Sequence, residues 1–242
     1  MQQKVSDYIA DFLVNNGVVD VFTVTGGGAM HLNDSLGHKD GMHCIYNHHE
    51  QASAMAAEAY ARIHNKVALV CVTSGPGATN AITGVVCGWM DSIPMLIISG
   101  QVRYATTVYA SNLNLRTRGV QEFNIIGCAE HMTKYCELVS SPQRIRYCLE
   151  KALYMCKTGR PGPCWLDIPL DVQAAIIDPE KLEAFIPPRQ GKENNKEMAR
   201  TIIDKINEAK RPALFVGNGV RLAGAHEEFL ELINKLNITV VT

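Results

Sequence analysis

The chain has 242 residues, of which 47% are hydrophobic and 19% are charged, and its net charge is −1. This length can bury a sizeable core, and the composition is typical of an ordinary globular protein. Because it has no basic run and no apolar stretch of about 20 residues, the sequence predicts neither a nucleic-acid-binding protein nor a membrane protein.

Helical spacing and continuous apolar runs alternate along most of the chain. Helices are expected at residues 4–16, 51–64, 78–90 and 142–157, and strands at residues 18–24, 67–72, 95–98 and 164–168. The strands lack polar alternation, which indicates strands that are covered on both faces in a parallel sheet. The pattern predicts an α/β fold with a doubly wound parallel sheet.

The pattern changes in a segment rich in proline and polar residues and then restarts with a helix, a strand, a second helix and a second strand. We therefore expect a first domain at residues 1–180, a linker at 181–196 and a second domain that begins at 197–242. The last segment is too short to cover both faces of a sheet, so it predicts an incomplete second α/β segment. The chain is expected to be a fragment of a longer one.

Eight cysteines occur, and none forms a Cys-x-x-Cys pair. Most lie in apolar strand or helix patterns, where free cysteine behaves as a small hydrophobic residue. Charged residues in the first turns exclude the apolar core of a signal peptide. These features predict a cytoplasmic protein.

Glu50 is the most informative residue of the chain. It follows a short apolar stretch and opens a helix in which alanine occurs at positions 52, 54, 56, 57, 59 and 61. A carboxylate in the first turn complements the helix dipole, which is one explanation for its position. The small residues that follow allow another backbone or a flat ligand to approach closely. A second explanation is therefore an acid that exchanges a proton with a ligand.

Two glycine-rich segments follow predicted strands, where ligands bind in sheets of this type. Gly26-Gly27-Gly28 lacks the spacing of a dinucleotide or Walker loop, so it is either a simple turn or a place where something flat approaches the backbone. The segment at residues 73–80 (Thr-Ser-Gly-Pro-Gly-Ala-Thr-Asn) joins a buried strand to a helix. It is either a rigid, capped turn or an anion site at the helix N-terminus.

Five of the eight histidines lie between positions 31 and 49. Their spacings match no zinc pattern, and the adjacent pair His48-His49 points in different directions. We expect no metal-binding residues in this chain.

Taken together and in this order, the motifs resemble the thiamine-diphosphate-dependent family that contains acetolactate synthase and the 2-keto-acid decarboxylases. The resemblance covers nearly the whole chain and rests on Gly26-Gly27-Gly28, His49-Glu50, residues 59–62, residues 73–80, Gly100-Gln101-Val102, Gln121-Glu122 and residues 159–172. It implies a flavodoxin-like pyrimidine-binding domain followed by the start of the central domain. The implied enzyme is a lyase or transferase that decarboxylates or carboligates a 2-keto acid.

The resemblance also implies roles for individual residues. Glu50 would hydrogen-bond the aminopyrimidine ring of the cofactor and control the proton exchange that activates it. Gln121 would lie near the reactive carbon, so these two residues are the catalytic candidates. The implied cofactor-binding residues, besides Glu50, are Thr25, Gly26, Thr73, Pro76, Asn80 and Gln101.

Some positions depart from the acetolactate synthase pattern. Val24-Thr25 stands where that enzyme has Tyr-Pro, Val120 replaces a phenylalanine, and residues 103–118 differ as a segment. The departures are at positions that the family turns toward the substrate. They leave open another 2-keto acid, an activated sugar or an aldehyde as the substrate.

The family binds the cofactor's diphosphate through magnesium at a Gly-Asp-Gly motif, and this chain contains none. The resemblance therefore implies thiamine diphosphate with magnesium, but only half of its site in this chain, completed in a homodimer or homotetramer. FAD is neither implied nor excluded. Two rivals stay open: a non-catalytic paralogue that dimerises or regulates, and one subunit of a split enzyme.

Overall fold

The computed structural model describes residues 2–111, 113–189 and 195–242. They form two compact units, Met1–Pro187 and Pro188–Thr242. Of the predicted linker at residues 181–196, residues 190–194 lie outside the described part. At its start, Leu182 is buried in the core of the first unit and Phe185 packs against Tyr147.

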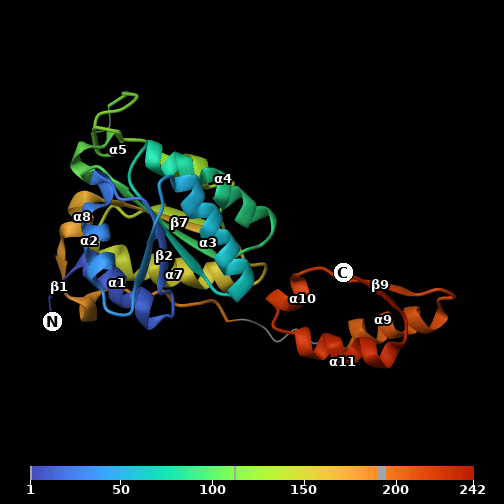
Figure 1. Cartoon of the computed structure of the whole chain (residues 1–242). Helices are drawn as coiled ribbons and strands as arrows, with labels where there is room; N and C mark the ends of the chain where they lie inside the picture. The colour runs from blue at the N-terminus through green and yellow to red at the C-terminus, as the bar shows by residue number, and fades with distance from the viewer. Residues whose placement is uncertain (1, 112, 190–194) are drawn as a thin grey trace. The chain divides into compact units, whose positions relative to one another are not determined.

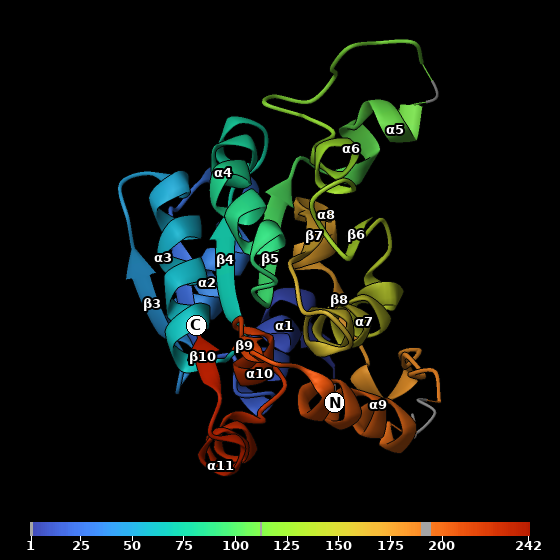
Figure 2. The same cartoon turned by 90° about the vertical axis from the view of Figure 1, so that its right-hand side faces the viewer.

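A six-stranded sheet forms the centre of the first unit (Figures 1 and 2). Its strand order is β3-β2-β4-β5-β7-β6, and all of its neighbouring strands are parallel. The strands are β2 (Asp20–Thr23), β3 (His43–Tyr46), β4 (Ala68–Val72), β5 (Met95–Gln101), β6 (Tyr135–Leu138) and β7 (Cys164–Pro169). The predicted α/β fold with a doubly wound parallel sheet is confirmed.

Helices cover both faces of this sheet. One face packs against α1 (Val5–Asn15), α2 (Met30–His38), α7 (Ile145–Lys157) and α8 (Leu170–Ala174), and the other against α3 (Glu50–His64), α4 (Pro76–Met90) and α6 (Ile125–Ala129). Within β4, Leu69 and Cys71 point to the first face, whereas Val70 and Val72 point to the second. This alternation explains why the strand is apolar at every position.

Shorter elements complete the first unit. They are β1 (Gln3–Lys4), which pairs antiparallel with β8 (Ile176–Ile177), the helix α5 (Val108–Ser111), and the 3₁₀ turns η1 (Gly27–Ala29), η2 (Tyr104–Thr106), η3 (Pro142–Arg144) and η4 (Pro179–Lys181). The helix predicted at 78–90 begins earlier, at Pro76, because proline fits the first helical turn without losing a hydrogen bond. The helix predicted at 142–157 begins as η3 before it continues as α7.

The alanine-rich helix α3 packs closely against α4. A Cβ atom on Gly84 of α4 would lie 2.5 Å from the Cβ atom of Ala54 in α3. The small residues of α3 therefore admit a neighbouring backbone, which is one of the two uses expected from the sequence. This close packing holds the N-terminal ends of both helices at the same edge of the sheet.

The second unit contains a two-stranded parallel sheet flanked by helices. Its elements are α9 (Lys196–Glu208), β9 (Ala213–Phe215), α10 (Gly219–Leu222), α11 (His226–Leu236) and β10 (Thr239–Val241). The predicted helix, strand, helix and strand are present, and the short helix α10, which was not predicted, is added between β9 and α11. Phe215 is 84% exposed, so the residues of this unit leave part of their apolar surface uncovered.

In neither unit does a described helix have both the length and the apolar character that a membrane span needs.

Candidate functional site

The residues of interest lie at the carboxyl edge of the sheet. Thr25 follows β2, Glu50 follows β3, Thr73 follows β4, and Gln101 is the last residue of β5. In parallel sheets this edge is where side chains from separate loops meet and where ligands bind. The sheet therefore gathers segments that are far apart in the sequence.

Glu50 is the first residue of α3, and its carboxylate faces the start of α4. His49 caps the helix by accepting a hydrogen bond from the Gln51 amide at 3.1 Å. Glu50 Oε2 accepts a hydrogen bond from Asn80 Nδ2 at 3.0 Å. Among the described residues, none donates a hydrogen bond to Glu50 Oε1. The carboxylate is thus held by one oxygen and has the other available.

Bare backbone surrounds the Glu50 carboxylate and the neighbouring Thr73. A Cβ atom on Gly77 would lie 3.2 Å from Glu50 Oε1 and 2.6 Å from Thr73 Cγ2. A Cβ atom on Gly26 would lie 2.5 Å from that of Thr73. Thr73 Oγ1 also accepts a hydrogen bond from the Gly28 amide at 2.9 Å. The two glycine segments therefore form one continuous surface around Thr73.

Two buried residues, Gly100 and Gln173, contact the Gly28 carbonyl and fix the position of this surface. Gly100 of β5 lies against the Gly28 carbonyl, and a Cβ atom there would overlap that oxygen. The Gly28 carbonyl also accepts a hydrogen bond from Gln173 Nε2 at 2.8 Å, and Gln173 is fully buried. The turn at residues 26–28 is consequently fixed by Gly100 of the central strand β5 and by Gln173, which is 145 positions away.

Gln121 lies at a second part of the edge, beside the start of α4. Its φ angle is +61°, and its carbonyl oxygen lies against Gly75, where a Cβ atom would overlap it. A cavity of about 510 Å³ is lined by Pro76, Gln121 and their neighbours Gly75, Thr79, Thr117, Gly119, Glu122 and Phe123. The structure thus brings Pro76 and Gln121 to one cavity.

Gln101 occupies a different environment from the other candidates. It is only 4% exposed; its Nε2 donates to Asp167 Oδ2 and to the Phe123 carbonyl, both at 2.9 Å, and its Oε1 accepts from the Val102 amide. Its carboxamide is therefore engaged within the domain, under the loop that carries Gln121. Contact between Gln101 and a cofactor stays a prediction.

Asp167 is a buried acid that was not among the residues predicted for the site. Ser99 Oγ donates to Asp167 Oδ1 at 2.6 Å, and Trp165 Nε1 donates to the same Ser99 oxygen at 2.8 Å. Burial raises the pKa of Asp167 to about 7, although the hydrogen bonds from Ser99 and Gln101 oppose this change. The signal that could have identified Asp167 in the sequence is an acidic residue within an otherwise apolar strand.

The raised pKa of Asp167 predicts a dependence of stability on pH. The folded state keeps a proton that the unfolded state loses, so this residue's contribution to the free energy of unfolding falls from about pH 4 to pH 7 and then levels off. Denaturant unfolding of wild type and Asp167→Asn across this range measures the difference. Exposed Asp40→Asn is the control, and equal slopes for wild type and Asp167→Asn would contradict the prediction.

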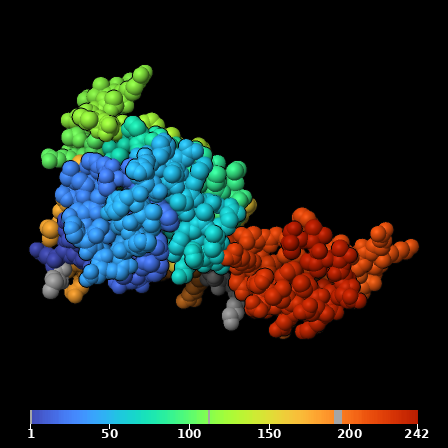
Figure 3. Space-filling model, in the orientation of Figure 1, coloured from blue at the N-terminus to red at the C-terminus, as the bar shows by residue number. Residues whose placement is uncertain are grey.

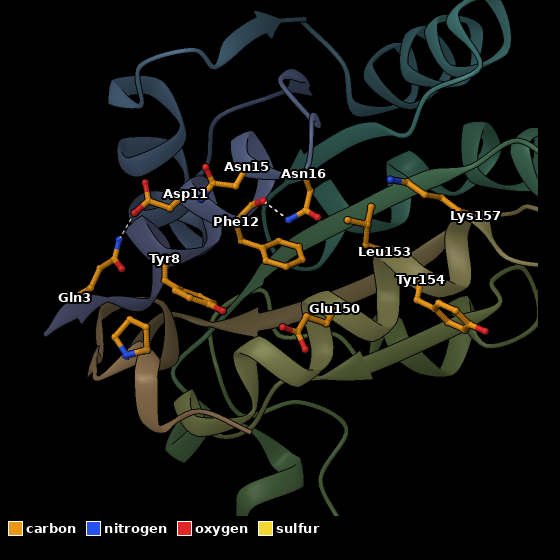
Figure 4. Close-up of a pocket in the computed structure, with 11 residues that line it drawn as sticks. Gln3, Tyr8, Asp11, Phe12, Asn15, Asn16, Glu150, Leu153, Tyr154 and Lys157 are labelled. Carbon is orange, nitrogen blue, oxygen red and sulfur yellow. Dashed lines mark hydrogen bonds between the residues drawn. The ribbon is translucent and has the colours of Figure 1, made fainter. Parts of the chain in front are cut away.

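The hollow between α1 and α7 is a different feature, on the face of the sheet away from Glu50. It has a volume of about 670 Å³ and lies beside Asp11, Asn16 and Glu150 (Figure 4). Asp11 accepts a hydrogen bond from Gln3 at 2.5 Å, and Glu150 is paired with Arg146. Because its carboxylates are already engaged, we place the functional site at the carboxyl edge.

Comparison with known families identifies the class of protein that this fold and site define. Residues 3–141 match the family described as "Thiamine pyrophosphate enzyme, N-terminal TPP binding domain", and residues 199–242 match the central domain of the same enzymes. The chain belongs to the thiamine pyrophosphate (thiamine diphosphate) enzyme family. The family resemblance predicted from the motifs is confirmed.

Individual relatives agree with this assignment. The chain is 32% identical to the acetolactate synthase isozyme 3 large subunit of Escherichia coli and 35% identical to the acetolactate synthase large subunit of Buchnera aphidicola, covering 98% and 95% of this chain. It spans 40% of the length of each of these proteins. A thiamine diphosphate-dependent 4-hydroxybenzoylformate decarboxylase from Rhodococcus jostii has the same fold, with a TM-score of 0.78 at 18% identity over 98% of this chain and 44% of that one.

Proposed function

We propose that the protein containing this chain uses thiamine diphosphate, bound with magnesium, to decarboxylate or carboligate a 2-keto acid. We also propose that residues 1–180 are its pyrimidine-binding domain and that 197–242 begin its central domain. The observation that carries the proposal is the Glu50 carboxylate, which Asn80 holds by one oxygen while the other faces bare backbone at Gly77.

The residues at this edge fit one end of the cofactor. The aminopyrimidine is a flat ring with hydrogen-bonding nitrogens, and it needs a carboxylate partner beside a surface without side chains. Glu50 offers the carboxylate, and Gly26 and Gly77 leave the neighbouring backbone bare beside Thr73. Thr25 is exposed next to Gly26, where it is available for contact with the ring.

We propose a separate role in the reaction for each of the residues at this edge. When bound, the cofactor supplies the electron sink that makes cleavage beside a keto carbon possible. Glu50 would hold and exchange a proton at its free oxygen, and Asn80 would keep that oxygen oriented. Pro76 and Gln121 would line the cavity next to the reacting carbon. Excluding water there would strengthen these interactions.

The other end of the cofactor needs partners that we do not find in this chain. No Gly-Asp-Gly motif occurs in it, and among the described residues no group of three or more His, Cys, Asp or Glu side chains could hold a metal ion. We propose that another part of the full-length protein, in a homodimer or homotetramer, provides the magnesium site. A cytoplasmic location, supported by eight free cysteines, belongs to the same proposal.

Release of carbon dioxide tests the proposed reaction. The full-length protein is incubated with thiamine diphosphate, magnesium and a panel of 2-keto acids that includes pyruvate. We expect cofactor-dependent carbon dioxide release from at least one of them. Failure of every acid with a protein that binds the cofactor would contradict the proposal.

Calorimetry of the 242-residue chain tests the proposal that it contains only the aminopyrimidine half of the cofactor site. With only the aminopyrimidine end present, we expect no tight binding of thiamine diphosphate in the presence of magnesium. The full-length protein under the same conditions is the control. Tight binding by the 242-residue chain alone would contradict the assignment of only half a site to it.

A further inference from the structure

The loop between β5 and α6 contains a carboxylate whose hydrogen-bond donors, among the residues that the structure describes, are all backbone amides. Glu122 Oε1 accepts from the Val108 amide at 2.6 Å, and Glu122 Oε2 accepts from the amides of Arg118 and Gly119 at 2.8 and 2.9 Å. Val108 is the first residue of α5, and Arg118 and Gly119 lie where the chain returns from the projecting segment that begins with α5 (Figures 1 and 3). One side chain therefore closes this segment into a loop.

The backbone amides around Glu122 favour the ionised form of its carboxyl group. Burial raises the pKa of its carboxyl group, but the hydrogen bonds from Gly119, Arg118 and Val108 outweigh that effect, so the pKa lies below its ordinary value. Hydrogen bonds between an ionised acceptor and backbone amides are stronger than neutral ones. An amide or a shorter side chain cannot reproduce all three.

The neighbours of Glu122 connect this loop to the proposed site. Gln121 precedes it with a φ of +61°, a conformation that most residues adopt only when the surroundings impose it. Phe123 follows it, and its carbonyl accepts a hydrogen bond from buried Gln101. Gln121 is therefore fixed on both sides, by the Glu122 carboxylate and by Gln101.

Two cavities share part of this backbone in their linings. The cavity of about 510 Å³ contains Gln121 and Pro76, and a second cavity of about 360 Å³ contains Gln101, Asp167 and Arg116. Glu122 and Phe123 line both. Residues 122 and 123 therefore belong to the lining of both cavities, and a shift of their backbone would move the adjacent Gln121.

We propose that Glu122 is a positioning residue: its carboxylate ties residues 108, 118 and 119 to the backbone beside Gln121 and so fixes Gln121 at the proposed site. The inference rests on the proposed function of Gln121 in the site. It differs from a purely structural role, because a purely structural Glu122 would affect stability and not the contribution of Gln121 to turnover.

Limited proteolysis tests the loop closure without any assay of activity. Trypsin can cut after Arg116 and Arg118, both exposed and inside the loop. We expect cleavage there to be at least about tenfold faster in Glu122→Gln, because a charge-assisted hydrogen bond is lost. Glu122→Asp should fall between this variant and wild type. Exposed Glu130→Gln is the matched control, and equal cleavage of Glu122→Gln and wild type would overturn the closure.

A double-mutant cycle in the full-length enzyme tests the link to Gln121. We compare kcat for Glu122→Gln, Gln121→Ala and the double variant, with the fraction of cofactor-loaded enzyme measured for each. If Glu122 acts through Gln121, its substitution lowers kcat in wild type and has little further effect in Gln121→Ala. If the fold-losses in kcat of the two single variants multiply in the double variant, the two residues act independently and the inference is overturned.

The same assay separates this inference from the proposed function. Glu50→Gln is measured alongside the cycle, and unchanged turnover in that variant would contradict the proposed function. The proteolysis result for Glu122 would still stand, since it requires no catalysis. Conversely, a large loss in Glu50→Gln with independent losses in the cycle would leave the proposed function intact and remove the role assigned to Glu122.

Discussion

Replacing Glu50 with glutamine is expected to lower turnover of the full-length enzyme by about 10²- to 10⁴-fold. Glutamine keeps the size of the side chain and an oxygen that can accept the Asn80 hydrogen bond. It cannot exchange a proton at the second oxygen, which faces Gly77. Steady-state assays at saturating thiamine diphosphate and magnesium separate this loss from weaker cofactor binding.

The control for Glu50 is an acid outside the site. Glu180 is exposed in η4, away from the carboxyl edge, and Glu180→Gln is expected to retain wild-type turnover. A thermal melt of both variants shows whether the fold is kept. Unchanged turnover in a folded, cofactor-loaded Glu50→Gln enzyme would remove Glu50 from the mechanism.

Introducing a side chain at Gly100 is expected to damage both stability and cofactor binding. In Gly100→Ala the new methyl group would overlap the Gly28 carbonyl, and the atoms around it are backbone atoms that cannot rotate away. Overpacking of this kind costs about 1–3 kcal/mol, and occasionally more. The turn at residues 26–28 would be pushed away from Thr73, so the surface that we propose for the aminopyrimidine ring would change. Denaturant unfolding and cofactor titration of the full-length protein measure the two effects.

Gly27→Ala is a matched control in the same turn. A Cβ atom on Gly27 would meet nothing within 4 Å, so this substitution is expected to change the free energy of unfolding little. It tests whether any added methyl group disturbs the turn or only one that meets the backbone. If Gly100→Ala were as stable as Gly27→Ala and bound the cofactor equally well, the prediction that close packing against Gly28 supports stability and cofactor binding would be wrong.

The central sheet was predictable because its strands are buried on both faces. In β4 and β7 every residue is buried, so the sequence is apolar or nearly so throughout, which is typical of strands in a covered parallel sheet. The long helices α1, α3 and α7 were predictable for a related reason, since their apolar residues recur on one face.

The edges of the sheet were harder to predict. Strand β3 is an edge strand, its terminal residues His43 and Tyr46 are exposed, and it was noted only as a short apolar stretch. Strand β6 is half-buried throughout and was not predicted. Helix α2 carries polar residues and a glycine, so its helical pattern is weak. These elements are specified by packing against the sheet more than by local sequence.

The candidate site was predictable only in part. Glycine segments after strands and an acid at a helix start are local signals, and they placed Glu50, Thr73 and Asn80 at one edge. Contacts between distant residues leave no such signal. Asp167 meets Gln101 across 66 positions, and the three amides bound by Glu122 become neighbours only when the loop closes.

The hydrogen bond from Gln173 to the Gly28 carbonyl spans 145 positions of the chain. During synthesis the turn at residues 26–28 therefore leaves the ribosome long before the residue that anchors it. Until residue 173 has emerged, the growing chain lacks one of the restraints on the surface that we propose for the cofactor. Chain elongation at about 5–20 residues per second would delay this restraint by roughly 7–30 seconds. In a nascent chain stalled before this point, Thr73 would lie beside a turn that Gln173 has not yet anchored.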